Sequence, residues 1–248
     1  MTEHFGKASS EFFVTAPSAC PYLPGRLERK VFTVLQGPTS ERANEVLTHR
    51  GFRRSQNIIY RPACDRCAAC VPVRAPARAF QPSRSQRRIM SRNADLQRAL
   101  RPPVATDEQF SLLRDYLDDR HSEGGMADMT LLDYMAMVEE TSVDTVMVEY
   151  RDFNGALAAC ALTDRLADGL SMVYSFFSPR AARRSLGAYM ILDHIALCNE
   201  ERRDFVYLGY WVENSPKMAY KTRFRPLERL TRRGWEPLNA PTQINGVK

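Results

Sequence analysis

Residues 178–188 read Ser178-Pro179-Arg180-Ala181-Ala182-Arg183-Arg184-Ser185-Leu186-Gly187-Ala188, and this stretch decides the predicted fold of the 248-residue chain. It links a predicted strand at residues 169–177 to a predicted helix at residues 186–199. The elements predicted around it are strands at residues 145–150, 157–163 and 205–211 and a shorter helix at residues 215–224. Strands, a helix and a further strand therefore follow one another in the second part of the chain.

A strong hairpin signal lies upstream of this stretch, at Asn154-Gly155. Both positions of the favoured two-residue turn need positive φ, so the dipeptide predicts that residues 146–150 pair with residues 157–163. Residues 169–177 then add a third strand to an antiparallel meander. A meander followed by such a loop and helix is the order of an N-acetyltransferase-like (GNAT-like) fold, which we predict for residues 104–248.

The loop before the predicted helix contains Arg183 and Arg184. Backbone N–H groups and the positive end of a helix dipole face whatever lies at such a helix start, so the sequence predicts an anionic occupant. In acetyltransferases that occupant is the pyrophosphate of coenzyme A, but the usual glycine-rich loop is reduced here to Gly187, which disfavours coenzyme A. An ordinary helix start with solvated arginines is the alternative.

Positive charge is concentrated in the first part of the chain. The whole sequence has a net charge of +6, whereas residues 1–103 alone carry 18 Lys and Arg against 7 Asp and Glu. Many of the arginines fall on a predicted basic helix at residues 83–100, namely Arg84, Arg87, Arg88, Arg92 and Arg98. Because Arg pairs bidentately with phosphate and stacks on bases, we expect a polyanionic partner. A solvated basic face without a ligand is the alternative.

Arg101-Pro102-Pro103 is the best linker candidate, and it divides the chain into two predicted domains. Residues 1–103 are predicted to form a small Cys-rich and Arg-rich α/β domain, with a helix at residues 40–50 between strands at residues 27–36 and 52–60. The fold class predicted for the whole chain is α+β. The opening residues lack the pattern of a signal peptide, and no apolar run approaches membrane-spanning length. We therefore expect a soluble, cytoplasmic protein without a membrane partner.

Four cysteines are candidate metal ligands. Cys64-Asp65-Arg66-Cys67-Ala68-Ala69-Cys70 places three thiols at two-residue gaps, and Cys20 lies upstream in a rigid loop with two prolines. Thiols at this spacing on a turn can converge on one ion or cluster, and the pattern suits an iron–sulfur cluster at least as well as structural zinc. The alternative is a set of free cysteines in a small-residue loop.

A cluster of aromatic and cationic residues lies near the end of the chain, in residues 207–211 and 215–224. Such residues can stack a base and hold a phosphate, or they can close a hydrophobic core. The sequence has no Ser-His-Asp order, no paired His ligands and no phosphate-cradling glycine loop. Covalent catalysis and nucleotide hydrolysis are therefore disfavoured.

Several motifs, taken in order, resemble those of a known family. They are Cys20-Pro21-Tyr22-Leu23-Pro24-Gly25-Arg26, Gly51-Phe52-Arg53-Arg54-Ser55, Tyr60-Arg61-Pro62 with the three cysteines, Tyr174-Ser175-Phe176, Arg184-Ser185-Leu186-Gly187 and Tyr207-Leu208-Gly209-Tyr210-Trp211. Together they look like the arginyl-tRNA–protein transferase family, and within it the bacterial aspartate/glutamate leucyltransferases. The resemblance covers about residues 12–236.

The resemblance implies an aminoacyltransferase with a GNAT-like catalytic domain. Its expected reaction is transfer of leucine from leucyl-tRNA to the N-terminal α-amine of proteins that begin with Asp or Glu, which marks them for N-end-rule degradation. Leucyl-tRNA and such proteins are then the expected partners, and transfer requires no cofactor. Three alternatives stay open: an arginyl-tRNA–protein transferase, a metal-stabilised RNA-binding module without catalysis, and a coenzyme A-dependent acetyltransferase.

A transferase for acidic N-termini needs a cation beside the reacting amine. The candidates for this role are Arg54, Lys217, Lys221 and Arg223, while Arg183 and Arg184 are expected to bind tRNA. Tyr174 and Tyr210 are candidate catalytic donors or proton relays near the carbonyl. The alternative for each cation is that it only binds tRNA phosphates or packs the edge of the sheet.

Overall fold

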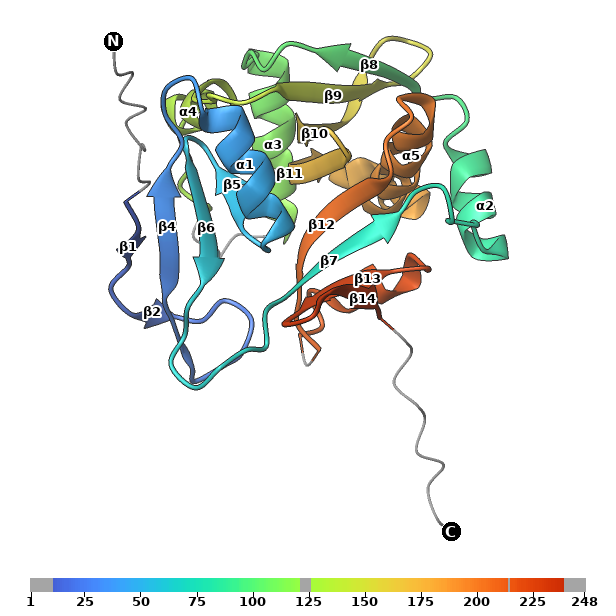
Figure 1. The fold of residues 1–248 in the computed structure, drawn as a ribbon. Coiled ribbons are helices and arrows are strands. Elements are labelled where there is room, and N and C mark those ends of the chain that lie inside the picture. Colours follow the sequence, from blue (N-terminus) through green and yellow to red (C-terminus); the bar gives the residue numbers. More distant parts are fainter. Residues whose placement is uncertain (1–10, 121–125, 214, 239–248) are drawn as a thin grey trace, which may run out of the picture.

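The computed structural model describes residues 11–120, 126–213 and 215–238. Within these residues the strands form an eight-stranded sheet, a four-stranded sheet and a two-stranded ribbon (Figure 1). In spatial order the eight strands are β14 (Gly234–Pro237), β13 (Glu228–Thr231), β7 (Val71–Pro76), β12 (Phe205–Trp211), β11 (Gly169–Phe177), β10 (Leu157–Arg165), β9 (Thr145–Arg151) and β8 (Gln97–Arg101).

The predicted meander is confirmed, because β9, β10 and β11 pair antiparallel in sequence order. The two strands β9 and β10 pair as the hairpin signal predicted, but their connection is residues 152–156 rather than a two-residue turn, and of Asn154 and Gly155 only Gly155 has a positive φ (+83°). The Asp152 carboxylate stabilises this turn by accepting hydrogen bonds from the N–H groups of Asn154 (2.9 Å) and Ala156 (3.0 Å). Helix α5 (Leu186–Glu200) then crosses over, so that β12 pairs parallel to β11. The α+β class and the GNAT-like element order are as predicted.

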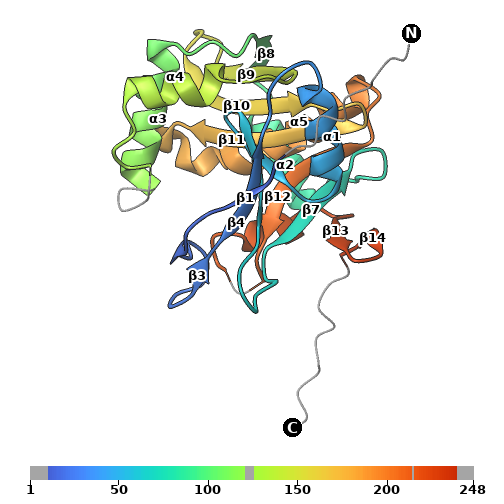
Figure 2. The same cartoon turned by 60° about the vertical axis from the view of Figure 1, so that its left-hand side comes forward.

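Both faces of the large sheet are covered, and the alternation of side chains along β10 shows how. Ala159 and Ala161 belong to the core on the side of α5, whereas Cys160 and Leu162 belong to the core on the opposite side. That opposite core is closed by α3 (Asp107–Arg120) and α4 (Leu131–Glu139), which lie together beside the meander (Figure 2). Successive side chains of a strand point to opposite faces, so a strand between two helical layers is apolar throughout. None of the described helices is both long and apolar enough to cross a membrane.

The first part of the chain builds the smaller sheet. Its strand order is β1 (Phe13–Val14), β4 (Lys30–Val34), β6 (Ile58–Pro62) and β5 (Arg53–Ser55), and α1 (Ser40–His49) and the ribbon of β2 (Ser18–Ala19) and β3 (Leu27–Glu28) flank it. Strands β7 and β8 also come from residues 1–103, yet they pair in the large sheet with strands of the second part. The two parts therefore share a sheet, and the boundary at residues 103/104 stays a prediction.

A buried ion pair ties the two sheets together. Arg54 of β5 donates from Nε and Nη2 to the two carboxylate oxygens of Asp164 on β10, at 2.7 and 2.6 Å. Both side chains are 1% exposed, and the Thr145 hydroxyl also donates to Asp164, at 2.9 Å. A bidentate, fully desolvated pair of this kind fixes orientation as well as distance.

Two predicted helices differ from the structure. The basic helix at residues 83–100 ends early, since α2 spans Arg84–Arg92 and the chain then turns into β8. Asn93 causes the break: it ends α2, its side chain is buried, and its amide donates to the carbonyls of Ile89 (2.8 Å) and Arg184 (2.9 Å). In place of the predicted helix at residues 215–224 the chain forms turns and a short 3-10 helix, η2 (Ala219–Arg223).

Candidate functional site

The central feature of the large sheet is the separation of β11 from β12. The two strands pair only over Gly169–Ser171 and Phe205–Tyr207, and then part. A register shift in β11 pairs Met172 and Tyr174 with successive residues of β10, which leaves Val173 without a partner there. Bulges of this kind often lie beside active sites, because they re-aim backbone and side chains. The gap between β11 and β12 is therefore the candidate site.

Arg53 reaches into this gap from β5 of the smaller sheet. Its Nη2 donates to the carbonyls of Met172 (3.1 Å) and Val173 (2.9 Å), the groups that the bulge turns away from the strand ladder. Arg53 is half-buried, and among the described residues no carboxylate forms an ion pair with it. The guanidinium therefore keeps its positive charge at the site while satisfying two backbone acceptors.

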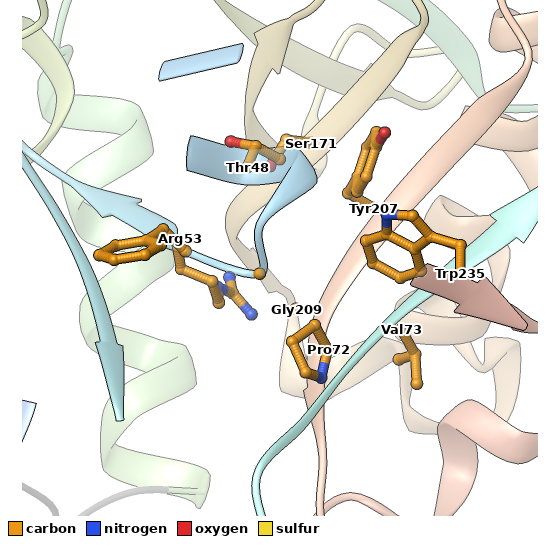
Figure 3. A pocket seen from close by; sticks show the side chains of 10 residues that line it. Thr48, Arg53, Pro72, Val73, Ser171, Tyr207, Gly209 and Trp235 are labelled. Atoms are coloured by element: carbon orange, nitrogen blue, oxygen red, sulfur yellow. The ribbon is translucent and has the colours of Figure 1, made fainter. Parts of the chain in front are cut away.

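Gly209 on β12 makes room for Arg53. Its φ is +71°, and a Cβ built there would lie 1.5 Å from Arg53 Nη1. The register of β12 against β7 shifts between Tyr207 and Gly209, so the glycine lies at an irregular point of the strand. Figure 3 shows Arg53 beside Gly209 in a pocket that Pro72, Tyr207 and Trp235 also line. Only glycine provides both the backbone conformation and the space at this position.

Lys221 is a second cation near the gap, and it is 3% exposed. Its Nζ donates to the Tyr210 carbonyl at 2.5 Å, and no carboxylate of the described residues pairs with it. Burial, with a smaller contribution from the nearby Arg53 charge, holds the pKa of Lys221 well below its ordinary value. A buried lysine next to a second cation and without a counter-ion is costly, so this arrangement favours an anionic ligand.

The two predicted catalytic tyrosines lie on either side of the gap. Tyr210 is buried, and its hydroxyl donates to the carbonyls of Gly51 (2.9 Å) and Tyr60 (3.2 Å). This geometry holds β12 against the smaller sheet. Tyr174 is half-buried on β11, and burial raises its pKa, so its hydroxyl stays protonated and can donate a hydrogen bond. Their catalytic roles stay predictions, and the geometry favours Tyr174 over Tyr210.

The structure places the remaining predicted cations in different surroundings. Arg54 is committed to Asp164, which does not favour its predicted role in binding the acceptor. Arg184 is also engaged, because its Nε donates to Asn93 Oδ1 at 2.9 Å and its Nη2 contacts Asp95. The exposed cations are Arg183, Lys217 and Arg223.

The cysteines gather without forming a metal site. Burial, with a smaller contribution from the neighbouring Cys20, Cys64 and Cys67 thiols, raises the pKa of Cys70 to about 11. Cys67 Sγ accepts a hydrogen bond from Arg26 at 3.4 Å, which favours the thiolate form of this cysteine. In the described parts of the chain no group of three or more His, Cys, Asp or Glu side chains is arranged to hold a metal ion. A zinc ion or iron–sulfur cluster at these cysteines is therefore not supported.

Sequence reasoning missed Arg53 and Gly209 as site residues. Arg53 and Arg54 are neighbours on a strand, and alternation sends one to the gap and the other to Asp164. The sequence cannot say which of the two goes where, because that depends on how the sheets pack. The signal for Gly209 was its position between bulky residues in Tyr207-Leu208-Gly209-Tyr210-Trp211, where a glycine marks a close approach.

Comparison with known proteins gives consistent matches over the chain. The family profile described as "Arginine-tRNA-protein transferase, N terminus" matches residues 18–88, and the profile "Arginine-tRNA-protein transferase, C terminus" matches residues 108–231. The aspartate/glutamate leucyltransferase of Parvibaculum lavamentivorans is 58% identical over 235 residues, which cover 95% of this chain and 98% of that protein. The aspartate/glutamate leucyltransferase of Rhodopseudomonas palustris is 56% identical and covers 97% of this chain and 96% of its own length. A solved structure of L-PGS from Bacillus licheniformis has a TM-score of 0.42 at 12% identity, over 69% of this chain and 51% of that one.

Proposed function

The chain belongs to the arginine-tRNA-protein transferase family, and from this membership we propose that it transfers leucine from leucyl-tRNA to the N-terminal α-amine of proteins beginning with Asp or Glu. The observation that carries the proposal is identity of 55–58% over nearly the whole chain to relatives named aspartate/glutamate leucyltransferase. Transfer converts an acidic N-terminus into leucine, which marks the protein for N-end-rule degradation. Because aminoacyl-tRNA is made in the cytoplasm, we place the enzyme there.

The reaction needs positioning more than covalent catalysis. The acceptor amine attacks the ester carbonyl of leucyl-tRNA, a tetrahedral intermediate forms, and the 3′-terminal ribose oxygen of the tRNA leaves with a proton that originates from the amine. An α-amino group has a pKa of about 8, so about one tenth of it is already neutral at pH 7. Bringing amine and carbonyl together and donating a hydrogen bond to the developing oxyanion supplies most of the acceleration. The protonated Tyr174 hydroxyl is the proposed donor.

The coenzyme A-dependent alternative is less well supported. Its pyrophosphate would need the loop before α5, which is the 3-10 helix η1 (Pro179–Arg184). The Ser185 side chain does not cap the N-terminus of α5. Arg184, however, is already hydrogen-bonded to Asn93 and Asp95. One of the two predicted cations of this loop is thus occupied by the protein itself.

We propose that tRNA binds along the exposed arginines of α2 and the adjacent η1. The two elements lie together, because Arg92 Nη1 donates to the Arg183 carbonyl at 2.5 Å. The exposed arginines of α2 are Arg84, Arg87, Arg88 and Arg92. Each neutralised phosphate contributes about one unit to the slope of log affinity against log salt concentration. An Arg84→Gln/Arg88→Gln variant should therefore lower the slope by about two units for two such contacts, and an unchanged slope would remove α2 from the interface.

The transfer itself is tested with purified protein, radiolabelled leucyl-tRNA and peptides that differ only in their first residue. We expect label on peptides beginning with Asp or Glu and none on otherwise identical peptides beginning with Asn or Gln. Arginyl-tRNA in parallel tests the arginyltransferase alternative. Binding of leucyl-tRNA without incorporation into any peptide would support the non-catalytic RNA-binding module and overturn the proposal.

A further inference from the structure

Two basic side chains lie against consecutive residues of β12 at the gap. A Cβ at Gly209 would lie 1.5 Å from Arg53 Nη1, and Lys221 Nζ donates to the carbonyl of the next residue, Tyr210. A role for this pair in binding the acceptor rests on the proposed function. Arg53 brings positive charge to the region between the smaller sheet, β12 and η2, and Lys221, whose pKa burial lowers, adds a second charge when it takes up a proton; no described carboxylate pairs with either. Among the described residues, the other Lys or Arg buried as deeply as Lys221 is Arg54, at 4% exposed, and it is paired with Asp164.

We propose that Lys221 and Arg53 together bind the side-chain carboxylate of the acceptor's first residue. Lys221 Nζ has three N–H groups when charged and uses one of them on the Tyr210 carbonyl. Arg53 donates to the β11 carbonyls through Nη2, and within the described residues its Nη1 and Nε make no hydrogen bond. A carboxylate offers two oxygens, one for each cation, and needs no larger opening than a short side chain.

The location fits the reaction. Arg53 is anchored to the carbonyls of Met172 and Val173, the residues directly before Tyr174 on β11. A carboxylate held at Arg53 is one or two methylene groups away from the Cα that carries the reacting amine, in Asp and Glu respectively. The amine is thereby delivered to the same stretch of β11 on which Tyr174 can donate to the oxyanion.

A carboxylate explains the burial of Lys221 better than a tRNA phosphate does. A phosphate in tRNA is attached to two bulky nucleosides and suits exposed arginines, such as those of α2. Arg53 is half-buried and Lys221 nearly fully buried, and this degree of burial suits a small group better than a phosphodiester. Beside Lys221, Tyr220 is 41% exposed, and its ring centroid lies 5.9 Å from Lys221 Nζ, which places the pair next to the surface.

The test compares wild type with Arg53→Gln, Lys221→Met and a control, Arg229→Gln, which removes an exposed cation from β13. Peptides beginning with Asp, Glu, Asn and Gln are assayed for kcat/KM at fixed leucyl-tRNA concentration, and binding of leucyl-tRNA is measured separately. A hydrogen bond to a charged group corresponds to a discrimination of about 10- to 100-fold. We expect Arg53→Gln and Lys221→Met to lower the Asp/Asn ratio by that factor with unchanged tRNA affinity, and Arg229→Gln to keep the wild-type ratio.

Three results would overturn the proposal. The first is an unchanged Asp/Asn ratio in folded Lys221→Met and Arg53→Gln. The second is a parallel loss of all peptide substrates, which would assign the pair a structural role. The third is weaker tRNA binding with an unchanged ratio, which would mean that the pair binds a phosphate.

A second measurement separates this proposal from the transfer reaction itself and does not require the variants to fold. Wild-type protein is heated with saturating Asp or Asn peptide in the absence of tRNA. We expect the Asp peptide to raise Tm more than the Asn peptide, since binding to the native state stabilises it. Equal shifts would overturn the carboxylate site, whereas a larger shift with Asp in a protein that transfers no leucine would overturn the proposed function only.

Discussion

Asp164→Asn should strongly destabilise the protein while hardly changing the shape of the side chain. Asp164 and Arg54 are each 1% exposed and joined by two hydrogen bonds of 2.6 and 2.7 Å. The substitution removes the negative charge and leaves the Arg54 guanidinium buried without a counter-ion. Arg54 lies on β5 of the smaller sheet and Asp164 on β10 of the large sheet, so the change loosens the contact between the two sheets.

The magnitude follows from the burial of the pair. Leaving one member of a fully buried ion pair uncompensated costs about 3–5 kcal/mol. For a chain of about this size, each kcal/mol lowers Tm by roughly 2–4 °C. The expected loss in Tm is therefore roughly 6–20 °C. Glu108→Gln is a matched control, because its ion pair with Arg151 is much more exposed (51% and 27%) and should contribute only about 0–1 kcal/mol.

The assay is thermal and urea denaturation followed by circular dichroism, with the double variant Arg54→Met/Asp164→Leu as the decisive comparison. Replacing both charges by apolar groups of similar size removes the unpaired ion, so the double variant should recover most of the stability lost in Asp164→Asn. A loss below about 1 kcal/mol in Asp164→Asn, which is the range of a surface pair, would refute the reasoning. So would a double variant less stable than the single one.

Three further predictions concern the gap and the cysteine loop. Gly209→Ala should displace Arg53, which its Cβ would meet at 1.5 Å, and reduce the Asp/Asn preference in the peptide assay; an unchanged preference would show that Arg53 does not bind the acceptor. Cys67 should be alkylated before Cys70, as followed by peptide mapping. A backbone N–H of the loop and Arg26 lower the pKa of Cys67, whereas burial raises the pKa of Cys70. Arg26→Gln should slow the alkylation of Cys67 and leave that of Cys70 unchanged. Lys221→Met should be more stable than wild type in urea at neutral pH, and the difference in the free energy of unfolding should disappear above about pH 10.5. The reason is that the pKa of Lys221 is lower in the native state than in the unfolded state, so the unfolded state binds the extra proton as the pH falls below about 10.5 and the native state is destabilised. A difference that does not change with pH would contradict this.

The meander and the crossover helix could be predicted from the sequence because local signals determine them. Asn154-Gly155 specifies a turn, and the apolar run of residues 157–162 in β10 matches a strand that is covered on both faces. The helix at residues 83–100 was predicted too long, because its basic and apolar spacing continues past Asn93. Tertiary hydrogen bonds from Asn93 end the helix, and such bonds to Arg184, far along the chain, leave no local sequence signal.

The candidate site was only partly predictable, for a related reason. Lys221 was selected as a cation near the reacting amine, but its burial and its lack of a carboxylate partner appear only in the folded chain. The sequence treats Arg53 and Arg54 alike, whereas the packing of the smaller sheet gives Arg54 a carboxylate and Arg53 two backbone carbonyls. Close spacing of the cysteines suggested ligands, but their side chains do not take up the arrangement of a metal site in the described residues.

The most direct test of the central claim is an intact-mass measurement on one reaction. Wild-type protein is incubated with a mixture of leucyl-tRNA and arginyl-tRNA and with two peptides that differ only in an N-terminal Asp or Asn. The account predicts that the Asp peptide gains the mass of a single leucine residue at its N-terminus and that the Asn peptide keeps its mass. Addition of arginine to the Asp peptide, equal modification of both peptides, or no modification of either would contradict it.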